Sequence, residues 1–111
     1  MTMARGDLPT GTVTLLFTDI EGSTRLASQL GLRFSAQLAE HDRILREAIS
    51  ANDGTVSSTA GDSFFATFSD AASAVVAAVG ALRGLHAFAW AGDPIRARMG
   101  LPPTRRAGSP P

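Results

Sequence analysis

The chain has 111 residues, 44% of them apolar, and its ten acidic residues balance ten basic ones, all of which are arginine. This length suits one small domain with a single core, and the absence of cysteine excludes disulfides, thiolate metal ligands and cysteine nucleophiles. Acids and bases are interspersed, and no apolar run is long enough for a signal peptide or a membrane span. We therefore expect a soluble cytoplasmic protein with no nucleic-acid or membrane partner.

The N-terminal part predicts a flexible leader over residues 1–10, followed by a strand. Thr12–Ile20 is rich in β-branched and apolar residues, with Val13, Leu15 and Phe17 on one face, as is typical of a strand. The sequence "EGST" then breaks this pattern.

A helical region should follow. Ser23 or Thr24 could cap a helix that begins near Arg25, because a hydroxyl there can accept from free amides of the first turn. From residue 34 onward, apolar residues and one histidine recur at helical spacing. They are Phe34, Leu38, His41, Leu45 and Ala48. The segment 52–54, with sequence "NDG", should end this helix.

The middle of the chain predicts a hairpin. Thr55–Ala60 and Ser63–Phe68 read as two strands separated by Gly61 and Asp62, a two-residue turn with glycine at its first central position. Asp62 would therefore lie at the tip of the hairpin.

A second helix and a last strand complete the pattern. Asp70 can cap a helix that "GDP" at 92–94 should end, and a strand is expected over Ile95–Leu101. Four residues of this helix share a face at helical spacing, namely Val75, Val79, Leu82 and His86. Residues 102–111 are rich in proline and predict a disordered tail.

The order strand, helices, strand, strand, helix, strand indicates an α+β fold of the ferredoxin-like βαββαβ type. This fold is an antiparallel four-stranded sheet with helices on one face. The first and third strands lie side by side at its centre, so the end of the first meets the start of the third. Asp19 and Asp62 should therefore face one another at the same edge of the sheet.

Two carboxylates beside a loop of free backbone amides suit a magnesium-bound triphosphate, because the carboxylates bind the cation and the amides bind the anion. Gly22 would let the backbone approach a phosphate closely. The competing interpretation is that acids at strand ends and in hairpin turns only solvate the loops. His41 and His86 lie on apolar helical faces and are interpreted as packed or half-exposed residues rather than ligands.

Four segments, "GTVTLLFTDIEGSTRL", "EHDRILREAI", "TAGDSFFATF" and "IRARMGL", resemble the N-terminal part of the class III nucleotidyl (adenylate and guanylate) cyclase catalytic domain. The likeness spans residues 11–101. It implies attack of the ribose 3′-hydroxyl of ATP, or less often GTP, on the α-phosphate, which yields a cyclic nucleotide and pyrophosphate. It also implies a head-to-tail dimer, either of this chain or with a complete cyclase domain, in which both subunits contribute to each site.

The resemblance also assigns site residues. Asp19 and Asp62 match the aspartates that bind two Mg²⁺ or Mn²⁺ ions, and Ile20 matches a residue that adds a carbonyl ligand. Four further residues match the phosphate-binding loop. They are Glu21, Gly22, Ser23 and Thr24.

The chain departs from the family pattern at two places. Ser58 stands where adenylate-specific members have a lysine that recognises adenine, and Pro102 and Pro103 follow Leu101 where the family continues towards further base-selecting, ribose-binding and phosphate-binding residues. The switch to proline-rich sequence predicts a truncated or out-of-frame end. We therefore expect weak or no cyclase activity from this chain alone, and no residue beyond the metal ligands is assigned a catalytic role.

Two alternatives remain open at the level of sequence. The first is a non-catalytic relic of the cyclase fold that binds nucleotide, dimerises or regulates a partner. The second is a haloacid dehalogenase-like phosphatase, because "FTDIEGST" partly matches the nucleophile motif of that class. Against the phosphatase, Glu21 replaces its second aspartate, lysine is absent, and the chain is short for a doubly wound sheet.

Overall fold

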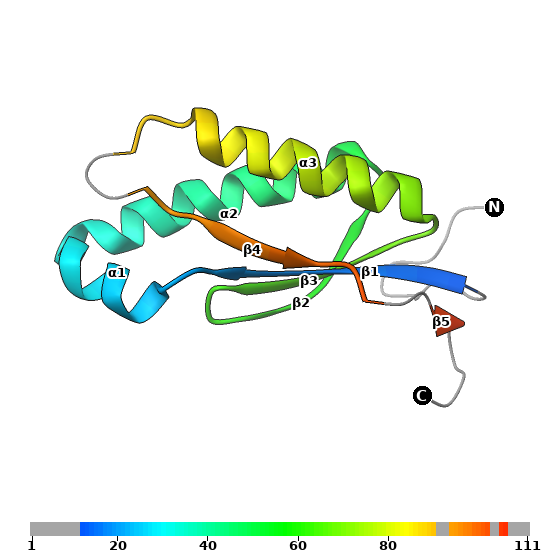
Figure 1. Ribbon diagram of the computed structural model, residues 1–111, viewed down its shortest axis with the longest axis horizontal. Helices are drawn as coiled ribbons and strands as arrows, with labels where there is room; N and C mark the ends of the chain where they lie inside the picture. Colours follow the sequence, from blue (N-terminus) through cyan, green and yellow to red (C-terminus); the bar gives the residue numbers. More distant parts are fainter. Residues whose placement is uncertain (1–11, 91–93, 103–104, 107–111) are drawn as a thin grey trace.

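The computed structural model describes residues 12–90, 94–102 and 105–106, and the expected leader over residues 1–10 lies outside them. Within these ranges one sheet and three α-helices are arranged in two layers (Figure 1). The elements are β1 (Thr12–Ile20), α1 (Ser23–Leu30), the short 3-10 helix η1 (Gly31–Arg33), α2 (Phe34–Ala51), β2 (Thr55–Ala60), β3 (Ser63–Phe68), α3 (Ala71–Ala87), β4 (Ala97–Gly100) and β5 (Arg105–Arg106).

The sheet has the strand order β2-β3-β1-β4, and all of its pairings are antiparallel. This is the predicted ferredoxin-like arrangement, with the first and third strands adjacent at the centre. The hairpin turn is also as predicted, because Gly61 has a φ of 59°, a left-handed value that favours glycine. The bounds of β1, β2 and β3 match the expected strands residue for residue.

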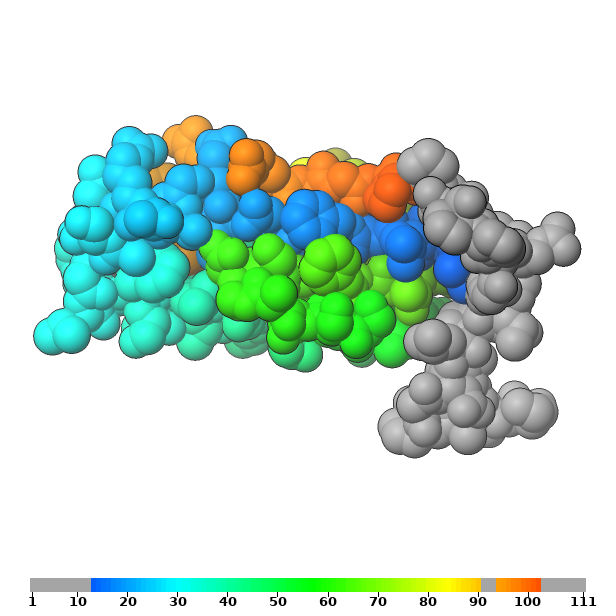
Figure 2. Space-filling model, turned by 90° about the horizontal axis from the view of Figure 1, so that it is seen from below, coloured from blue at the N-terminus to red at the C-terminus, as the bar shows by residue number. Residues whose placement is uncertain are grey.

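Helices α2 and α3 cover one face of the sheet, and α1 lies at the end where β1 finishes (Figure 1). Figure 2 looks onto the other face, where β1 lies between the β2–β3 hairpin and β4. The main core lies between the sheet and the two long helices, and Leu45, Phe64 and Phe68 are almost fully buried in it. A smaller cluster under α1 contains Ile20 and Ile95.

Strand β1 does not simply bury an apolar face and expose a polar one, because both of its faces carry apolar side chains. Val13, Leu15 and Phe17 do share a face, as predicted, but they are only half-buried and lie on the side that the helices leave open. The core side of β1 carries four buried residues. They are Thr14, Leu16, Thr18 and Ile20. Because Asp19 has the same parity as Phe17, its side chain belongs to the open face.

Helix α3 begins as predicted, because the Asp70 carboxylate accepts a hydrogen bond of 2.8 Å from the backbone amide of Ser73. Its predicted apolar face, however, is exposed to solvent: Val75, Val79 and Leu82 are 41–46% exposed and His86 is exposed as well. The buried face consists mainly of small residues, namely Ala74, Ala77, Ala78, Ala81 and Leu85. Alanine lets the helix lie close to its neighbours, whereas the larger valines would not fit there.

Several element ends differ from the expected ones. Helix α1 begins at Ser23 rather than near Arg25, and neither hydroxyl caps it, because Gly22 in a left-handed conformation (φ 62°) starts the helix without a side-chain cap. Helix α3 ends at Ala87, before the segment 92–94, of which only Pro94 lies within the described residues.

The C-terminal part of the chain differs as well. Strand β4 covers four residues rather than the seven expected over Ile95–Leu101. Of the expected disordered tail over residues 102–111, the structure describes only residue 102 and Arg105–Arg106, which form β5 and pair with Thr12 and Val13; the rest lies outside the described residues. The described pairings of β4 with β1 cover only Phe17–Ile20, which leaves the edge at the start of β1 available to β5. Among the described residues, no helix is both long and apolar enough to cross a membrane.

Candidate functional site

The open-face end of β1 presents Asp19, whose side chain retains 26% of its accessible surface. Asp19 pairs with Arg98 in the register of β1 and β4, and its Oδ2 accepts a hydrogen bond of 2.9 Å from Arg98 Nη2. The Arg98 side chain is 61% exposed. The carboxylate thus stands at the sheet surface with a cation beside it and access from solvent.

Asp62 lies at the tip of the β2–β3 hairpin, at the same end of the sheet as Asp19. The last described pair between β1 and β3 joins Thr18 to Phe64; Asp19 follows Thr18, and Asp62 precedes Phe64 by two residues. The Oδ2 atom of Asp62 is buried and has no hydrogen-bond partner among the described residues. A buried carboxylate oxygen without a partner carries a desolvation cost that a bound cation would offset.

The segment from residue 21 to residue 24 joins β1 to α1 and leaves several backbone amides free. The Glu21 amide donates to the carbonyl of Arg96 at 2.8 Å, and the first helical hydrogen bond runs from the Leu26 amide to the Gly22 carbonyl. The backbone amides of residues 23–25 therefore have no acceptor within the helix, and no side chain caps them. Such a helix start attracts anions, through its free donors and its dipole.

Ile20 connects this loop to the core. Its side chain is 1% exposed and packs with Leu26, Leu30 and Ile95. Burial of Ile20 fixes the end of β1, so that the neighbouring Asp19 and Glu21 are held in place on the surface.

Ser58 lies on the same face as Asp19. In the pairing registers Ser58 is opposite Phe65, Phe65 is opposite Phe17, and Phe17 is opposite Gly100. Directly paired residues share a face of the sheet, so these four residues form one row across the open face. The row passes through Phe17, which precedes Asp19 by two residues on β1. The Phe17 and Phe65 rings have their centroids 5.0 Å apart. Ser58 itself is exposed and brings a hydroxyl, not a charge, to this row.

Arg98 was not assigned a role from the sequence. It lies 79 residues from Asp19, and only the register between β1 and β4 brings the two together. The repeated alternation in "IRARM" is the one local signal, since it places Arg96 and Arg98 on the same side of an extended segment. Asp19, Asp62, the uncapped start of α1 and Arg98 therefore all lie toward the end of the sheet where β1 finishes.

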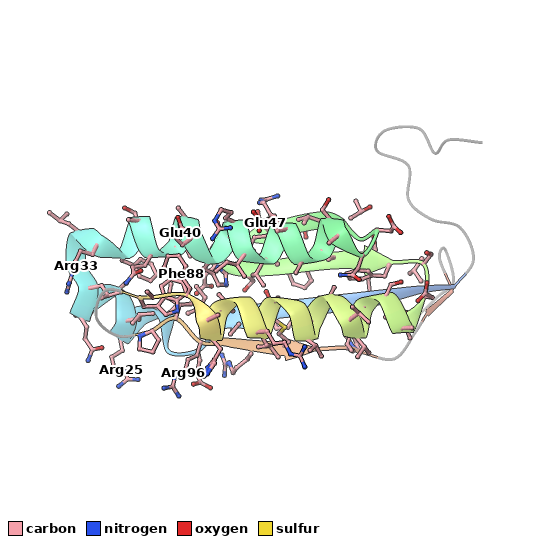
Figure 3. The ribbon with its side chains drawn as sticks, turned by 90° about the horizontal axis from the view of Figure 1, so that it is seen from above. Arg25, Arg33, Glu40, Glu47, Phe88 and Arg96 are labelled. Atoms are coloured by element: carbon pink, nitrogen blue, oxygen red, sulfur yellow. The ribbon has the colours of Figure 1, made fainter. Side chains whose placement is uncertain are left out.

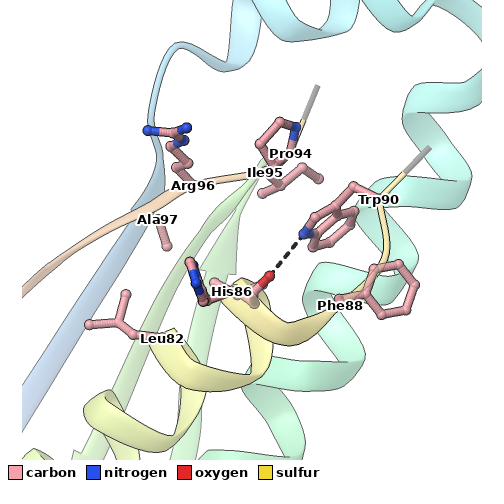
Figure 4. Close-up of a pocket in the computed structure, with 9 residues that line it drawn as sticks. Leu82, His86, Phe88, Trp90, Pro94, Ile95, Arg96 and Ala97 are labelled. Carbon is pink, nitrogen blue, oxygen red and sulfur yellow. Dashed lines mark hydrogen bonds between the residues drawn. The ribbon is translucent and has the colours of Figure 1, made fainter. Parts of the chain in front are cut away.

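The histidines lie apart from this arrangement. His41 is completely buried on α2, with its Nδ1 2.9 Å from Asp42 Oδ1 and its ring 6.0 Å from that of Phe64. His86 lines a recess of about 530 Å³ between the end of α3 and the start of β4, where Trp90 Nε1 donates to the Leu85 carbonyl (Figure 4). Within the described ranges no three His, Cys, Asp or Glu residues cluster as metal ligands.

Comparison with known proteins identifies the class. The model of the adenylate and guanylate cyclase catalytic domain matches residues 7–85, which is most of the chain. The chain therefore belongs to the adenylate and guanylate cyclase catalytic domain family.

Similar sequences include an uncharacterised protein of Mycobacterium tuberculosis H37Rv, 39% identical over 95 residues, which are 84% of this chain and 31% of that protein. Receptor-type adenylate cyclase B of Leishmania donovani is 43% identical over 70 residues, which are 63% of this chain and 5% of that protein. The chain thus spans about a third or less of the length of these relatives.

Solved structures agree on the fold. An adenylate cyclase of Trypanosoma brucei in its monomeric state superposes with a TM-score of 0.78 at 23% identity, over 87% of this chain and 58% of that one. The guanylate cyclase domain from Catenaria anguillulae, in complex with GTP, gives a TM-score of 0.72 at 22% identity, over 82% and 55% of the two chains. The present chain corresponds to a little more than half of each cyclase domain structure.

Proposed function

We propose that this chain provides the metal-binding and phosphate-binding half of a nucleotidyl cyclase site. The observation that supports the proposal is that Asp19, the Asp62 oxygen without a partner and the uncapped start of α1 all lie toward the same end of the sheet. Hard carboxylate oxygens suit Mg²⁺ or Mn²⁺, and free amides suit the phosphates of a nucleoside triphosphate.

The residues present fit a divalent metal. Asp62 offers an oxygen that lacks a partner, and Asp19 offers a half-exposed carboxylate whose bond to Arg98 is an exposed ion pair that a cation can replace. Ile20 would add its backbone carbonyl. When bound, two such ions favour ionisation of a ribose hydroxyl and neutralise charge on a leaving pyrophosphate.

In the proposed reaction the 3′-oxygen of ATP or GTP forms a bond to the α-phosphorus, the bond to the β-phosphate oxygen breaks, and the hydroxyl proton passes to solvent or to a base supplied by the partner. This chain's own part is to orient the triphosphate. The amides of residues 23–25 hold its anionic oxygens, and Arg98, displaced from Asp19, offers a guanidinium to them. Ser58 cannot supply the cationic contact to the base that lysine gives in adenylate-specific relatives.

The proposed working state is a dimer, either of two copies or with a complete cyclase domain. The open sheet face supports it, because Leu15, Phe17 and Phe65 form a half-exposed apolar row next to the site. The second candidate function is a nucleotide-binding or regulatory module without catalysis. The existing Asp19–Arg98 pair favours this candidate, because it keeps one carboxylate neutralised without metal.

A complementation assay separates the two candidates. The chain is mixed with a complete class III cyclase domain whose own two metal aspartates have been replaced, and the cyclic AMP formed from ATP and the cyclic GMP formed from GTP are measured with Mn²⁺. Activity that appears only in the mixture, and is lost with Asp19→Asn or Asp62→Asn in this chain, supports catalysis. Glu47→Gln, an exposed acid on α2, is the matched control.

The metal site has its own test. Mn²⁺ binding to the chain alone is measured by calorimetry for the wild type and the same three variants. Binding that both aspartate variants weaken and Glu47→Gln does not, without complementation, supports the non-catalytic module. Unchanged Mn²⁺ binding in both aspartate variants would exclude the metal site at Asp19 and Asp62 and with it the catalytic proposal.

A further inference from the structure

The core contains a histidine that the proposed site does not use. His41 lies on the side of α2 that faces the sheet and has no exposed surface. Figure 3 looks down on α2 and α3 above the sheet, and the labelled Glu40 and Glu47 mark the solvent-facing side of α2. A polar ring buried in this way loses its contacts with water when the protein folds, which costs free energy unless other groups replace them.

Only one of the two ring nitrogens of His41 has a partner among the described residues. Nδ1 lies 2.9 Å from Asp42 Oδ1, and because an ionised carboxylate can only accept, this nitrogen carries a hydrogen. In the neutral ring Nε2 is then an acceptor. Nε2 is buried and has no described hydrogen-bond partner. His41 therefore presents an unused acceptor to the core.

The end of β1 presents the complementary group. Thr18 has no exposed surface, and its Oγ1 is also buried without a partner in the described part of the chain. A hydroxyl can donate a hydrogen bond as well as accept one. Thr18 lies on the core side of β1 and immediately precedes Asp19. The core thus holds an unused donor next to the candidate site.

Phe64 on β3 is a neighbour of both groups. It is directly opposite Thr18 in the register of β1 and β3, and its ring centroid lies 6.0 Å from that of His41 in an edge-on arrangement. Directly paired residues on one face of a sheet have Cβ atoms about 5 Å apart. All three residues are at most 2% exposed. Thr18 and His41 therefore pack around the same side chain inside the core.

We propose that Thr18 Oγ1 and His41 Nε2 share one ordered water molecule, and that this link makes the two residues positioning residues for the candidate metal site. The two atoms are not bonded to one another in the structure. A water molecule accepts from the hydroxyl and donates to the ring nitrogen, and so satisfies both. The inference rests on the proposed function for the role of Asp19, whereas the link itself requires no metal.

The link would act on both aspartates of the candidate site. Thr18 is the residue before Asp19 on β1, and Phe64 follows Asp62 by two residues on the hairpin. A link from Thr18 to α2, closed around Phe64, limits how far the end of β1 and the hairpin turn can move apart. Metal ligands bind more tightly when groups behind them fix their positions in advance.

The first test asks whether the two residues are coupled. Urea unfolding of Thr18→Val, His41→Leu and the double variant forms a double-mutant cycle, in which we expect the unfolding equilibrium constants to depart from additivity by about fivefold. Thr67→Val is the matched control, because Thr67 Oγ1 is likewise buried without a described partner but lies opposite Leu15. Its effect should simply add to that of His41→Leu. Circular dichroism spectra establish that each variant is folded.

A crystal structure of the wild type tests the link directly, since one water should lie within about 3.2 Å of both Thr18 Oγ1 and His41 Nε2. A core without that water would overturn the link. Additive effects of Thr18→Val and His41→Leu would overturn it as well.

The second test separates positioning from packing. In calorimetric titration with Mn²⁺, Thr18→Val and His41→Leu should each bind about tenfold more weakly than the wild type. Thr18→Ser, which keeps the hydroxyl, and Thr67→Val should bind like the wild type. Equal Mn²⁺ affinity in all four variants would overturn the positioning role. Mn²⁺ binding that ignores Asp19→Asn and Asp62→Asn would instead overturn the proposed metal site, while non-additivity in the cycle would retain the link.

Discussion

Asp19 on β1 and Arg98 on β4 stand directly opposite one another in the sheet, and their side chains form an ion pair of 2.9 Å on the open face. The pair neutralises the carboxylate that the proposed metal would use. Metal binding and this ion pair therefore compete for the same oxygen atoms. A metal ion that binds Asp19 must first break this ion pair. The free energy of an exposed pair of this kind is roughly 0.2–1 kcal/mol.

Arg98→Gln should therefore raise the affinity for free Mn²⁺ by up to about fivefold, because Asp19 no longer has to release a cation. Calorimetry without nucleotide measures this directly, and Arg83→Gln, another exposed arginine, is the control. A fall in Mn²⁺ affinity for Arg98→Gln would contradict the competition.

Asp62→Asn should separate the stability of the free protein from its response to metal. The buried Oδ2 has no partner, so loss of the carboxylate charge should leave the metal-free protein at least as stable as the wild type. Mn²⁺ at about one hundred times its Kd should stabilise the wild type by about 2.7 kcal/mol and the variant far less. Urea denaturation with and without Mn²⁺ checks both statements, and equal stabilisation of the two proteins would contradict the assignment.

The local features of this fold were readable from the sequence. Strands β2 and β3 follow from the two-residue turn signal at Gly61–Asp62, and the start of α3 follows from Asp70. Both signals act over a few residues and need no knowledge of distant contacts. The resemblance to cyclases could point to Asp19 and Asp62 because each of them lies in a short motif that is read from neighbouring residues alone.

What the sequence could not supply depends on tertiary contacts. Both faces of β1 carry apolar or β-branched residues, so the pattern alone does not say that Leu16 faces the helices and Phe17 does not. The burial of alanines on α3 depends on how close α2 and the sheet approach. The role of Arg98 depends on a register between segments 79 residues apart.

Gly84→Ala should destabilise the protein by about 1–3 kcal/mol. A Cβ atom at Gly84 would lie 2.8 Å from Ile44 Cγ2, so α2 and α3 would have to separate. Gly80→Ala on the same helix is the matched control, since its Cβ would meet only Ala48 Cβ at 4.0 Å. That control should gain roughly 0.5–1 kcal/mol from helix propensity. Urea unfolding of both variants measures the contrast, and equal effects would show that the helices are not in close contact at Gly84.

Phe65→Ser should reduce self-association of the chain if the open sheet face forms the dimer. Phe65 is 38% exposed and its ring lies 5.0 Å from that of Phe17, so the substitution removes the centre of the apolar row. Loss of this aromatic pair should also cost about 0.5–1.5 kcal/mol of stability beyond the apolar area that Phe65 buries, so circular dichroism first checks that the variant is folded. Leu32→Ser, at a fully exposed leucine on η1, removes a comparable side chain away from the sheet. Sedimentation velocity over a range of concentrations should show dimers for the wild type and Leu32→Ser, and monomers for Phe65→Ser. Dimers that persist in Phe65→Ser would place the interface on another surface, of which the exposed valines of α3 are the first to test.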